Sequence, residues 1–214
     1  MGTTVALIDY GSGNLRSAEK ALLRAAGALG GVSVATTYDP DLIAGADQVV
    51  LPGVGAFAAC MRALSARAGV IEAMTQAVRG RGAPFLGICV GMQLLADRGL
   101  EFGETAGLGW MAGDVARLTP VGPRFKIPHM GWNALDAGAG ASLLSGLPAG
   151  AHMYFTHSFA FTPSDAADVV AWTDHGGRIA AAVTLGNIAG VQFHPEKSQA
   201  MGARLLSNFL EWRP

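Results

Sequence analysis

Residues 85–95, FLGICVGMQLL, place a cysteine between two glycines where an apolar strand-like run gives way to a helix-like one. The glycines permit a sharp strand-to-helix turn, the geometry of a nucleophile elbow with sulfur in place of oxygen. N–H groups at the start of the following helix, Val90 first, favour a thiolate and can stabilise an oxyanion. These residues alone leave two alternatives open: a reactive Cys89, or a small side chain buried in a tight turn.

A thiol nucleophile needs a base, and residues 192–199, QFHPEKSQ, supply a candidate after a late apolar strand. His194 could take the thiol proton and return it to a leaving amine. Glu196 could bind the other ring nitrogen and fix the tautomer. A lone histidine at a strand end is usually structural. A His-Pro-Glu in the same chain as a Gly-x-Cys-x-Gly elbow favours a Cys–His–Glu triad instead.

A glycine-containing loop, PGVG at residues 52–55, also follows a strand and should border the same crevice. Its glycines allow a backbone N–H, near Val54 and Gly55, to approach a reacting carbonyl as a second oxyanion donor beside Val90. A plain turn is the alternative, and only the position of the loop favours the chemical interpretation.

The composition points to a subunit rather than a free-standing protein. The 214 residues suffice for one core, so we expect a single domain over 1–214. Half of the residues are hydrophobic and 14% are charged, against about 25% in typical domains. Much of the chain must therefore be covered by the fold or by an interface. A net charge of -1 offers no basic surface for nucleic acid or for an anionic membrane.

The cysteines, the longest uncharged run and the histidines argue against a disulfide framework, a membrane span and a metal site, respectively. Two cysteines make no disulfide framework, which fits a reducing, cytoplasmic setting. The longest uncharged run, 137–164, is interrupted by Pro148, Gly150 and two histidines, and cannot cross a membrane. The five histidines show neither HExxH nor paired CxxC spacing, so we expect no metal and no cofactor.

The first half alternates strand-like and helix-like patterns, which is typical of βαβ units. Strands are predicted at 4–10, 32–37, 47–52 and 84–89. Between them we expect helices at 14–27, ended by Gly27, at 38–46, with Asp39 as N-cap, and at 57–79. We therefore expect an α/β fold with an open, mostly parallel, flavodoxin-like sheet and helices on both faces.

The second half is richer in strands, predicted at 114–118, 152–161, 168–173 and 178–193, the last a hairpin turning at Gly186 and Asn187. We expect them to add antiparallel strands to the parallel sheet. A final helix over 198–212, with Ser198 as N-cap, carries the stripe Met201, Leu205 and Phe209, which predicts a core face.

The motifs IDYGSGNLRS (8–17), LPGVGAF (51–57), LGICVGMQLL (86–95), PHMGWN (128–133) and GVQFHPEKSQ (190–199) together resemble the class I, triad-type glutamine amidotransferases. The elbow and the His-Pro-Glu are shared across that superfamily. PHMGWN and HPEKSQ are similar, more narrowly, to the glutaminase subunits of imidazole glycerol phosphate synthases in histidine biosynthesis.

The resemblance implies that Cys89 attacks the side-chain amide of glutamine, forms a glutamyl thioester and releases ammonia, with His194 and Glu196 completing the triad. It implies an oxyanion strand at PGVG that needs a peptide flip near Val54. It also implies a set of substrate-binding residues: Gln93, Glu101 and the backbone of His157, Ser158 and Phe159.

The resemblance further implies a heterodimer in which ammonia passes to a cyclase subunit with a (β/α)8 barrel. The positions that match the partner-facing residues of such subunits are Asn14, Met130, Trp132, Tyr154 and Lys197. For Trp132, ordinary packing after a proline-rich turn is the alternative. A permanent interface would account for the low charge content.

Three other functions remain open. The chain could be the glutaminase subunit of another synthase, such as a pyridoxal phosphate synthase, whose members are not expected to carry PHMGWN. It could be a catalytically silent regulatory partner, against which the complete triad argues. It could also be a free-standing thiol hydrolase on a similar fold, which would turn over without a partner.

Overall fold

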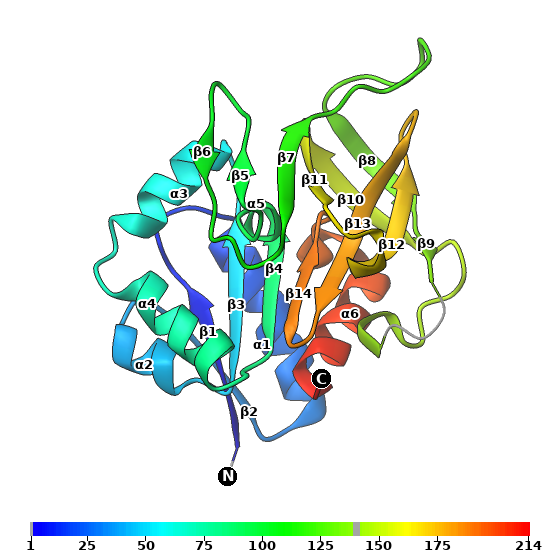
Figure 1. Ribbon diagram of the computed structural model, residues 1–214. Coiled ribbons are helices and arrows are strands. Elements are labelled where there is room, and N and C mark those ends of the chain that lie inside the picture. The colour runs from blue at the N-terminus through cyan, green and yellow to red at the C-terminus, as the bar shows by residue number, and fades with distance from the viewer. Residues whose placement is uncertain (1, 139–141) are drawn as a thin grey trace.

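The computed structural model describes residues 2–138 and 142–214 and has an eight-stranded central sheet (Figure 1). The strand order is β2-β1-β3-β4-β14-β13-β12-β9. The first five strands are parallel: β2 (Val32–Thr37), β1 (Thr3–Ile8), β3 (Gln48–Gly53), β4 (Phe85–Cys89) and β14 (Ile188–Val191). The antiparallel remainder is β13 (Arg178–Leu185), β12 (Val169–Asp174) and β9 (Asp136–Ala137). The order β2-β1-β3-β4 is the flavodoxin-like one predicted.

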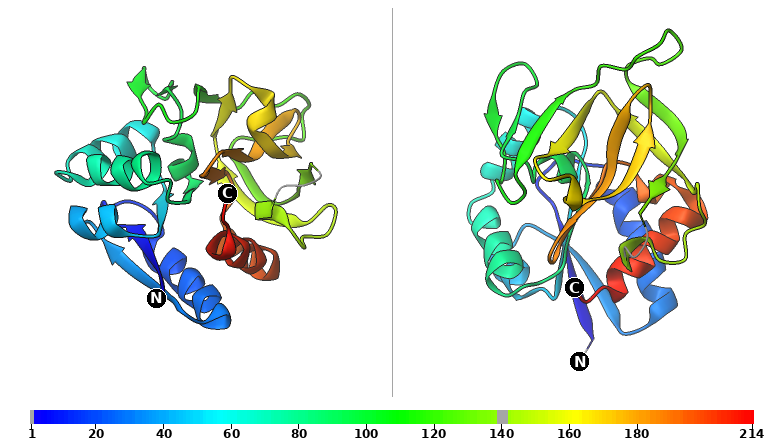
Figure 2. Two further views of the ribbon diagram at one scale, coloured as in Figure 1. Left: turned by 60° about the horizontal axis from the view of Figure 1, so that its bottom comes forward. Right: turned by 45° about the vertical axis from the view of Figure 1, so that its right-hand side comes forward.

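Helices cover both faces of this sheet, because strands β3, β4 and β14 are buried along their whole length and need apolar cover on each side. On one face α1 (Leu15–Leu29) packs against α6 (Gln199–Glu211). On the other lie α2 (Pro40–Gly45), α3 (Phe57–Ser65) and α4 (Val70–Thr75) (Figure 2). Leu205 and Phe209 of α6 are fully buried, as their spacing predicts. Among the described residues, none of the helices combines the length and the apolar character needed to cross a membrane.

Two helix predictions need correction. Helix α1 does not end at Gly27 but continues to Leu29 and is closed by Gly30, which has φ +72°. Gly27 faces no crowded neighbour, and the burial of Ala25 and Ala26 offsets its low helix propensity. The helix predicted over 57–79 is divided, because Gly69 has φ +78° and opens α4, which runs into a π-helical turn at Gln76–Gly80. Asp39 does cap α2 as predicted.

The segments predicted as strands at 114–118 and 152–161 do not join the main sheet, contrary to our expectation. The strand predicted at 152–161 is interrupted at Ser158, so that β10 (His152–His157) and β11 (Phe159–Pro163) belong to different sheets. β10 pairs with β8 (His129–Ala134), formed by the PHMGWN segment, where we predicted no strand. β11 pairs with β7 (Gly113–Arg117), which also joins β5 (Arg98–Gly99), itself paired with β6 (Thr105–Ala106). These strands therefore form two small sheets over the carboxyl ends of the parallel strands, and they do not extend the main sheet.

Candidate active site

The elbow forms at the end of β4, where Cys89 has φ +54° and ψ -110°, a conformation that L side chains rarely adopt. The glycines permit it through close contacts. A Cβ on Gly87 would lie 2.5 Å from the Gly91 carbonyl oxygen, and one on Gly91 would lie 1.8 Å from that of Leu51. The helix that follows, α5 (Val90–Gln93), has only one turn, shorter than the run of apolar residues suggests. Val90 opens it, so its N–H has no intrahelical partner.

The predicted base and its orienting carboxylate are paired. His194 Nδ1 lies 2.8 Å from Glu196 Oε1, and both side chains are buried. A short 3₁₀ turn (Pro195–Lys197) places Glu196, and its backbone approaches α6 at Gly202, where a Cβ would lie 1.9 Å from the Pro195 oxygen. Ser198 occupies the N-cap position, but its hydroxyl donates to the His194 carbonyl and does not cap α6.

The pKa of His194 is raised to about 9. Burial is the largest influence and pulls the pKa down, but the Cys89 thiol and the Glu196 carboxylate together outweigh it. Among the described residues, His194 Nε2 has no hydrogen-bond partner. Cys89 thus lies near enough to raise the histidine pKa without a formed bond to Nε2, a loose arrangement common in unliganded sites. An imidazolium here favours a thiolate at Cys89.

The PGVG loop lies beside the thiol, since Gly53 pairs with Cys89 in the register of β3 and β4. Its carbonyls are held from outside the loop. The Val54 oxygen accepts from Ser12 Oγ at 2.9 Å and from Cys60 Sγ at 3.3 Å, and the Pro52 oxygen accepts from Tyr10. The sequence indicated no role for Ser12 or Cys60, since nothing in the spacing of these residues marks their contact with Val54.

Gln93 donates both of its amide hydrogens to the protein: Nε2 lies 2.9 Å from the Phe159 carbonyl oxygen and 3.0 Å from Gln192 Oε1. Gln93 can therefore offer a ligand only its oxygen. Gln192, which the sequence did not single out, in turn places its Nε2 3.7 Å from Cys89 Sγ.

Glu101 lines the cavity around Cys89, but one of its carboxylate oxygens has a partner within the protein. Glu101 Oε2 accepts from the N–H of Phe57 at 2.9 Å and so satisfies the first turn of α3. The second oxygen remains for a ligand amino group.

The 157–159 segment is anchored by a contact between His157 and His129, both buried, that the sequence did not indicate. His157 Nδ1 lies 2.9 Å from the Phe159 carbonyl, and its Nε2 lies 2.9 Å from His129 Nδ1. The pKa of His157 is lowered to about 4 and that of His129 to about 3, in both cases mainly by burial. Ser158 and Phe159 already accept protein hydrogen bonds through their carbonyls.

A cavity of about 620 Å³ unites most of the predicted residues. Those that line it are Asn14, Val54, Gly55, Cys89, Val90, Gln93, Glu101, His157, Ser158, Phe159, His194 and Lys197. Glu196 lies behind His194. The cavity sits at the carboxyl ends of the parallel strands, as expected for this fold. Gly13, which precedes Asn14 in the IDYGSGN loop, also lines the cavity.

The predicted partner-facing residues lie together beside this cavity. Trp132 and Tyr154 face one another across β8 and β10 with ring centroids 6.0 Å apart, and Lys197 Nζ lies 5.5 Å from the Tyr154 ring centre. Met130 is 63% and Trp132 46% exposed. Trp132 therefore lies at the surface against Tyr154 and does not pack in the core.

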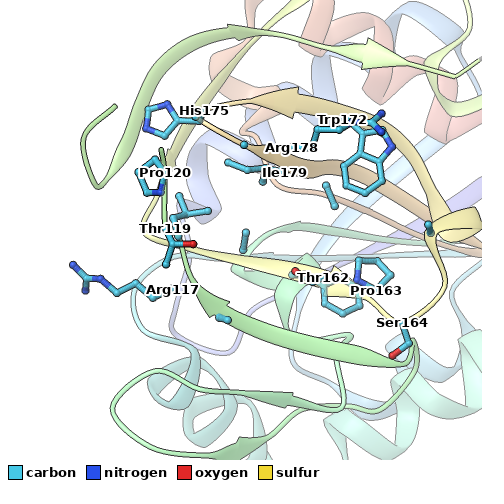
Figure 3. Close-up of a pocket in the computed structure, with 18 residues that line it drawn as sticks. Arg117, Thr119, Pro120, Thr162, Pro163, Ser164, Trp172, His175, Arg178 and Ile179 are labelled. Carbon is cyan, nitrogen blue, oxygen red and sulfur yellow. The ribbon is translucent and has the colours of Figure 1, made fainter. Parts of the chain in front are cut away.

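A second pocket, of about 370 Å³, lies between β7 and β11 on one side and β12 and β13 on the other. Figure 3 shows Trp172 and His175 at opposite ends of it, and Arg117 pointing outward. Arg178 stacks on Trp172, 4.5 Å from the ring centre. The residues lining this pocket include neither cysteine and none of the predicted site residues. We therefore assign the chemistry to the larger cavity around Cys89.

Known proteins resemble this chain over nearly its whole length. Residues 6–212 match the family Glutamine amidotransferase class-I. Imidazole glycerol phosphate synthase subunit HisH of Caulobacter vibrioides is 63% identical over 212 residues, 99% of each chain. The subunit HisH of Rhodospirillum rubrum is 55% identical over 213 residues, 98% of this chain and 99% of the relative.

Solved structures agree on the fold alone. The crystal structure of a glutamine amidotransferase superposes with a TM-score of 0.70 at 20% identity, over 98% of each chain. A glutamine amidotransferase from Thermotoga maritima gives a TM-score of 0.60 at 17% identity, over 92% of this chain and 77% of the other. With a cysteine elbow, a buried His–Glu pair and a family match over nearly its whole length, the chain belongs to the class I glutamine amidotransferases.

Proposed function

We propose that residues 1–214 form one glutamine amidotransferase domain, the glutaminase subunit of an imidazole glycerol phosphate synthase acting in histidine biosynthesis. The observation that carries the proposal is Cys89 on its elbow, beside a buried His194 paired with Glu196 at 2.8 Å. The high identity to relatives named as subunits of that synthase supports the choice of synthase. A cytoplasmic location is part of the proposal, because both cysteines are free.

In the proposed reaction the Cys89 thiolate attacks the side-chain carbonyl carbon of glutamine. The oxyanion that forms is stabilised by the Val90 N–H and by an N–H of the Val54–Gly55 loop. His194 gives its proton to the leaving nitrogen, so ammonia departs and a glutamyl thioester remains. Water then attacks the thioester with His194 as base, and glutamate leaves with the thiolate restored.

The remaining cavity residues would bind the substrate. The Glu101 carboxylate suits the α-ammonium group of glutamine, and the Gln93 oxygen can accept a hydrogen bond from it or from the amide. The 157–159 backbone forms the facing wall. No step requires a cofactor or metal, and neither nucleic acid nor membrane has a part in the proposal.

Ammonia would pass to a cyclase subunit with a (β/α)8 barrel, docked over Asn14, Met130, Trp132, Tyr154 and Lys197. Asn14 and Lys197 of this set line the cavity, and Met130 and Trp132 carry exposed apolar surface. If the partner reorients the peptide at Val54, the Val54 carbonyl must lose the hydrogen bonds that it accepts from Ser12 and Cys60.

Cys89→Ala tests the assignment of the nucleophile. We expect glutamine hydrolysis to fall to background while the circular dichroism spectrum and the affinity for the cyclase stay unchanged. Cys60→Ala, which removes the other thiol, is the control and should retain measurable turnover. Glutamine hydrolysis by the Cys89→Ala variant would refute the assignment.

A further inference from the structure

Gln192 occupies the position next to the nucleophile in the adjacent strand. Val191 pairs with Ile88 in the parallel register of β14 and β4, so Gln192 and Cys89 are the next residues on the two strands. The Gln192 side chain is fully buried, and its Nε2 lies 3.7 Å from Cys89 Sγ. It does not line the substrate cavity.

The direction of this hydrogen bond follows from its neighbours. The Phe159 carbonyl can only accept, so the atom of Gln93 that lies 2.9 Å from it must be the amide nitrogen. The atom of Gln192 that faces the same nitrogen must then be the oxygen. The NH₂ group of Gln192 is thereby turned toward sulfur, and a flipped amide would break the chain of bonds.

The same carbonyl orders the other half of the network. His157 Nδ1 must donate to Phe159, so its Nε2 accepts from His129 Nδ1. His129 Nε2 then accepts from Asn133 Nδ2. Every donor has an acceptor when both histidines are neutral. The Phe159 carbonyl, to which Gln93 donates, is therefore itself fixed by the two buried histidines.

We propose that Gln192 is a further catalytic residue, whose side-chain amide donates a hydrogen bond to the Cys89 sulfur and stabilises the attacking thiolate. A donor to sulfur favours the anion over the thiol and fixes the direction of the attacking lone pair. Gln93 acts as the positioning residue that orients this donor. The inference rests on the proposed role of Cys89 as the nucleophile.

The test is alkylation of the intact chain by iodoacetamide between about pH 5 and about pH 10, with each cysteine followed separately by mass spectrometry. Gln192→Met keeps the side-chain volume and removes the donor. We expect the midpoint of the Cys89 alkylation profile to move up by about one pH unit, with a rate about tenfold lower below the midpoint. For glutamine hydrolysis we expect a lower kcat and a nearly unchanged KM.

Two further variants complete the test. Gln192→Glu keeps the shape and replaces the donor with an acceptor, so it should shift the midpoint further. Gln48→Leu alters another buried glutamine, bonded to the Phe209 carbonyl away from the site, and should leave the profile unchanged. An unshifted profile in a folded Gln192→Met or Gln192→Glu chain overturns the role of Gln192. Glutamine hydrolysis without Cys89 would instead overturn the proposed function, so the two failures are distinguishable.

Discussion

At the scale of single residues, residue types and spacing in the sequence indicated which groups could react. They did not indicate the direction of the hydrogen bonds around those groups. Cys89, His194 and Glu196 could be chosen from the sequence because a glycine-flanked thiol and a His-Pro-Glu leave few other interpretations. Gln192 could not, because its importance depends on a hydrogen-bond direction that is set by Phe159. The same holds for His129, which acts through His157.

Glu196→Gln should lower the pKa of His194 from about 9, since the carboxylate helps to raise it. A histidine with a folded-state pKa above its unfolded value of about 6.5 adds stability below that pH and loses it as pH rises through about 9. The variant should therefore lose less unfolding free energy between these pH values than the wild type does. Histidine NMR titration and denaturant unfolding measure both effects, and an unmoved His194 titration would refute the pairing.

The lowered pKa of His157 predicts the opposite pH dependence of the unfolding free energy, at acid pH. Its pKa of about 4 lies below the unfolded value of about 6.5, so its contribution is present above pH 6.5 and is lost as pH falls toward 4. The shift corresponds to about 3 kcal/mol of unfolding free energy. His157→Gln should flatten this acid limb, whereas His152→Gln, at an exposed position, should not. Equal acid losses in wild type and His157→Gln would contradict the account.

At the scale of elements, the sequence predicted the first four parallel strands well, because β3 and β4 in particular are continuous apolar runs. It missed that β14, expected as an antiparallel addition, pairs parallel with β4. It failed for PHMGWN, whose His129 and Asn133 are polar yet belong to β8, because their side chains bond to each other within the protein. The sequence also predicted β10 and β11 as one strand, because an interruption at a single serine leaves no break in the hydrophobic pattern.

Gly91→Ala and Gly27→Ala form a matched pair that tests the packing of the elbow. A Cβ at Gly91 would lie 1.8 Å from the Leu51 oxygen, so β3 and α5 must separate, and we expect a loss of at least about 2 kcal/mol with loss of turnover. A Cβ at Gly27 meets nothing within 4 Å, so that variant should gain about 0.5–1 kcal/mol. Denaturant unfolding distinguishes them. Similar stability in the two variants would refute the close contact.

At the scale of the whole molecule, the low charge content has a structural counterpart in the exposed apolar and aromatic surface beside the cavity mouth. Met130 and Trp132 project from β8, whose buried side holds the His129 side chain. A partner covering this surface would therefore contact the strand that supports the 157–159 wall of the cavity.

Trp132→Ala should weaken the affinity for the cyclase at least about tenfold, because a half-exposed aromatic side chain in such a surface is a typical anchor. Leu42→Ala, 57% exposed on α2, is the control and should leave affinity unchanged. Calorimetric titration of each variant gives the comparison. An unchanged affinity for Trp132→Ala would place the interface elsewhere.

The most direct measurement is glutamate release from glutamine by the purified chain and by its Cys89→Ala variant, each alone and with both the cyclase and the nucleotide ligand of the cyclase. We predict low release by the wild-type chain alone, a strong rise with the partner and ligand, and background release by the variant throughout. Release that persists without Cys89 would contradict the proposed chemistry. Equal wild-type release with and without the partner would contradict the assignment as a synthase subunit.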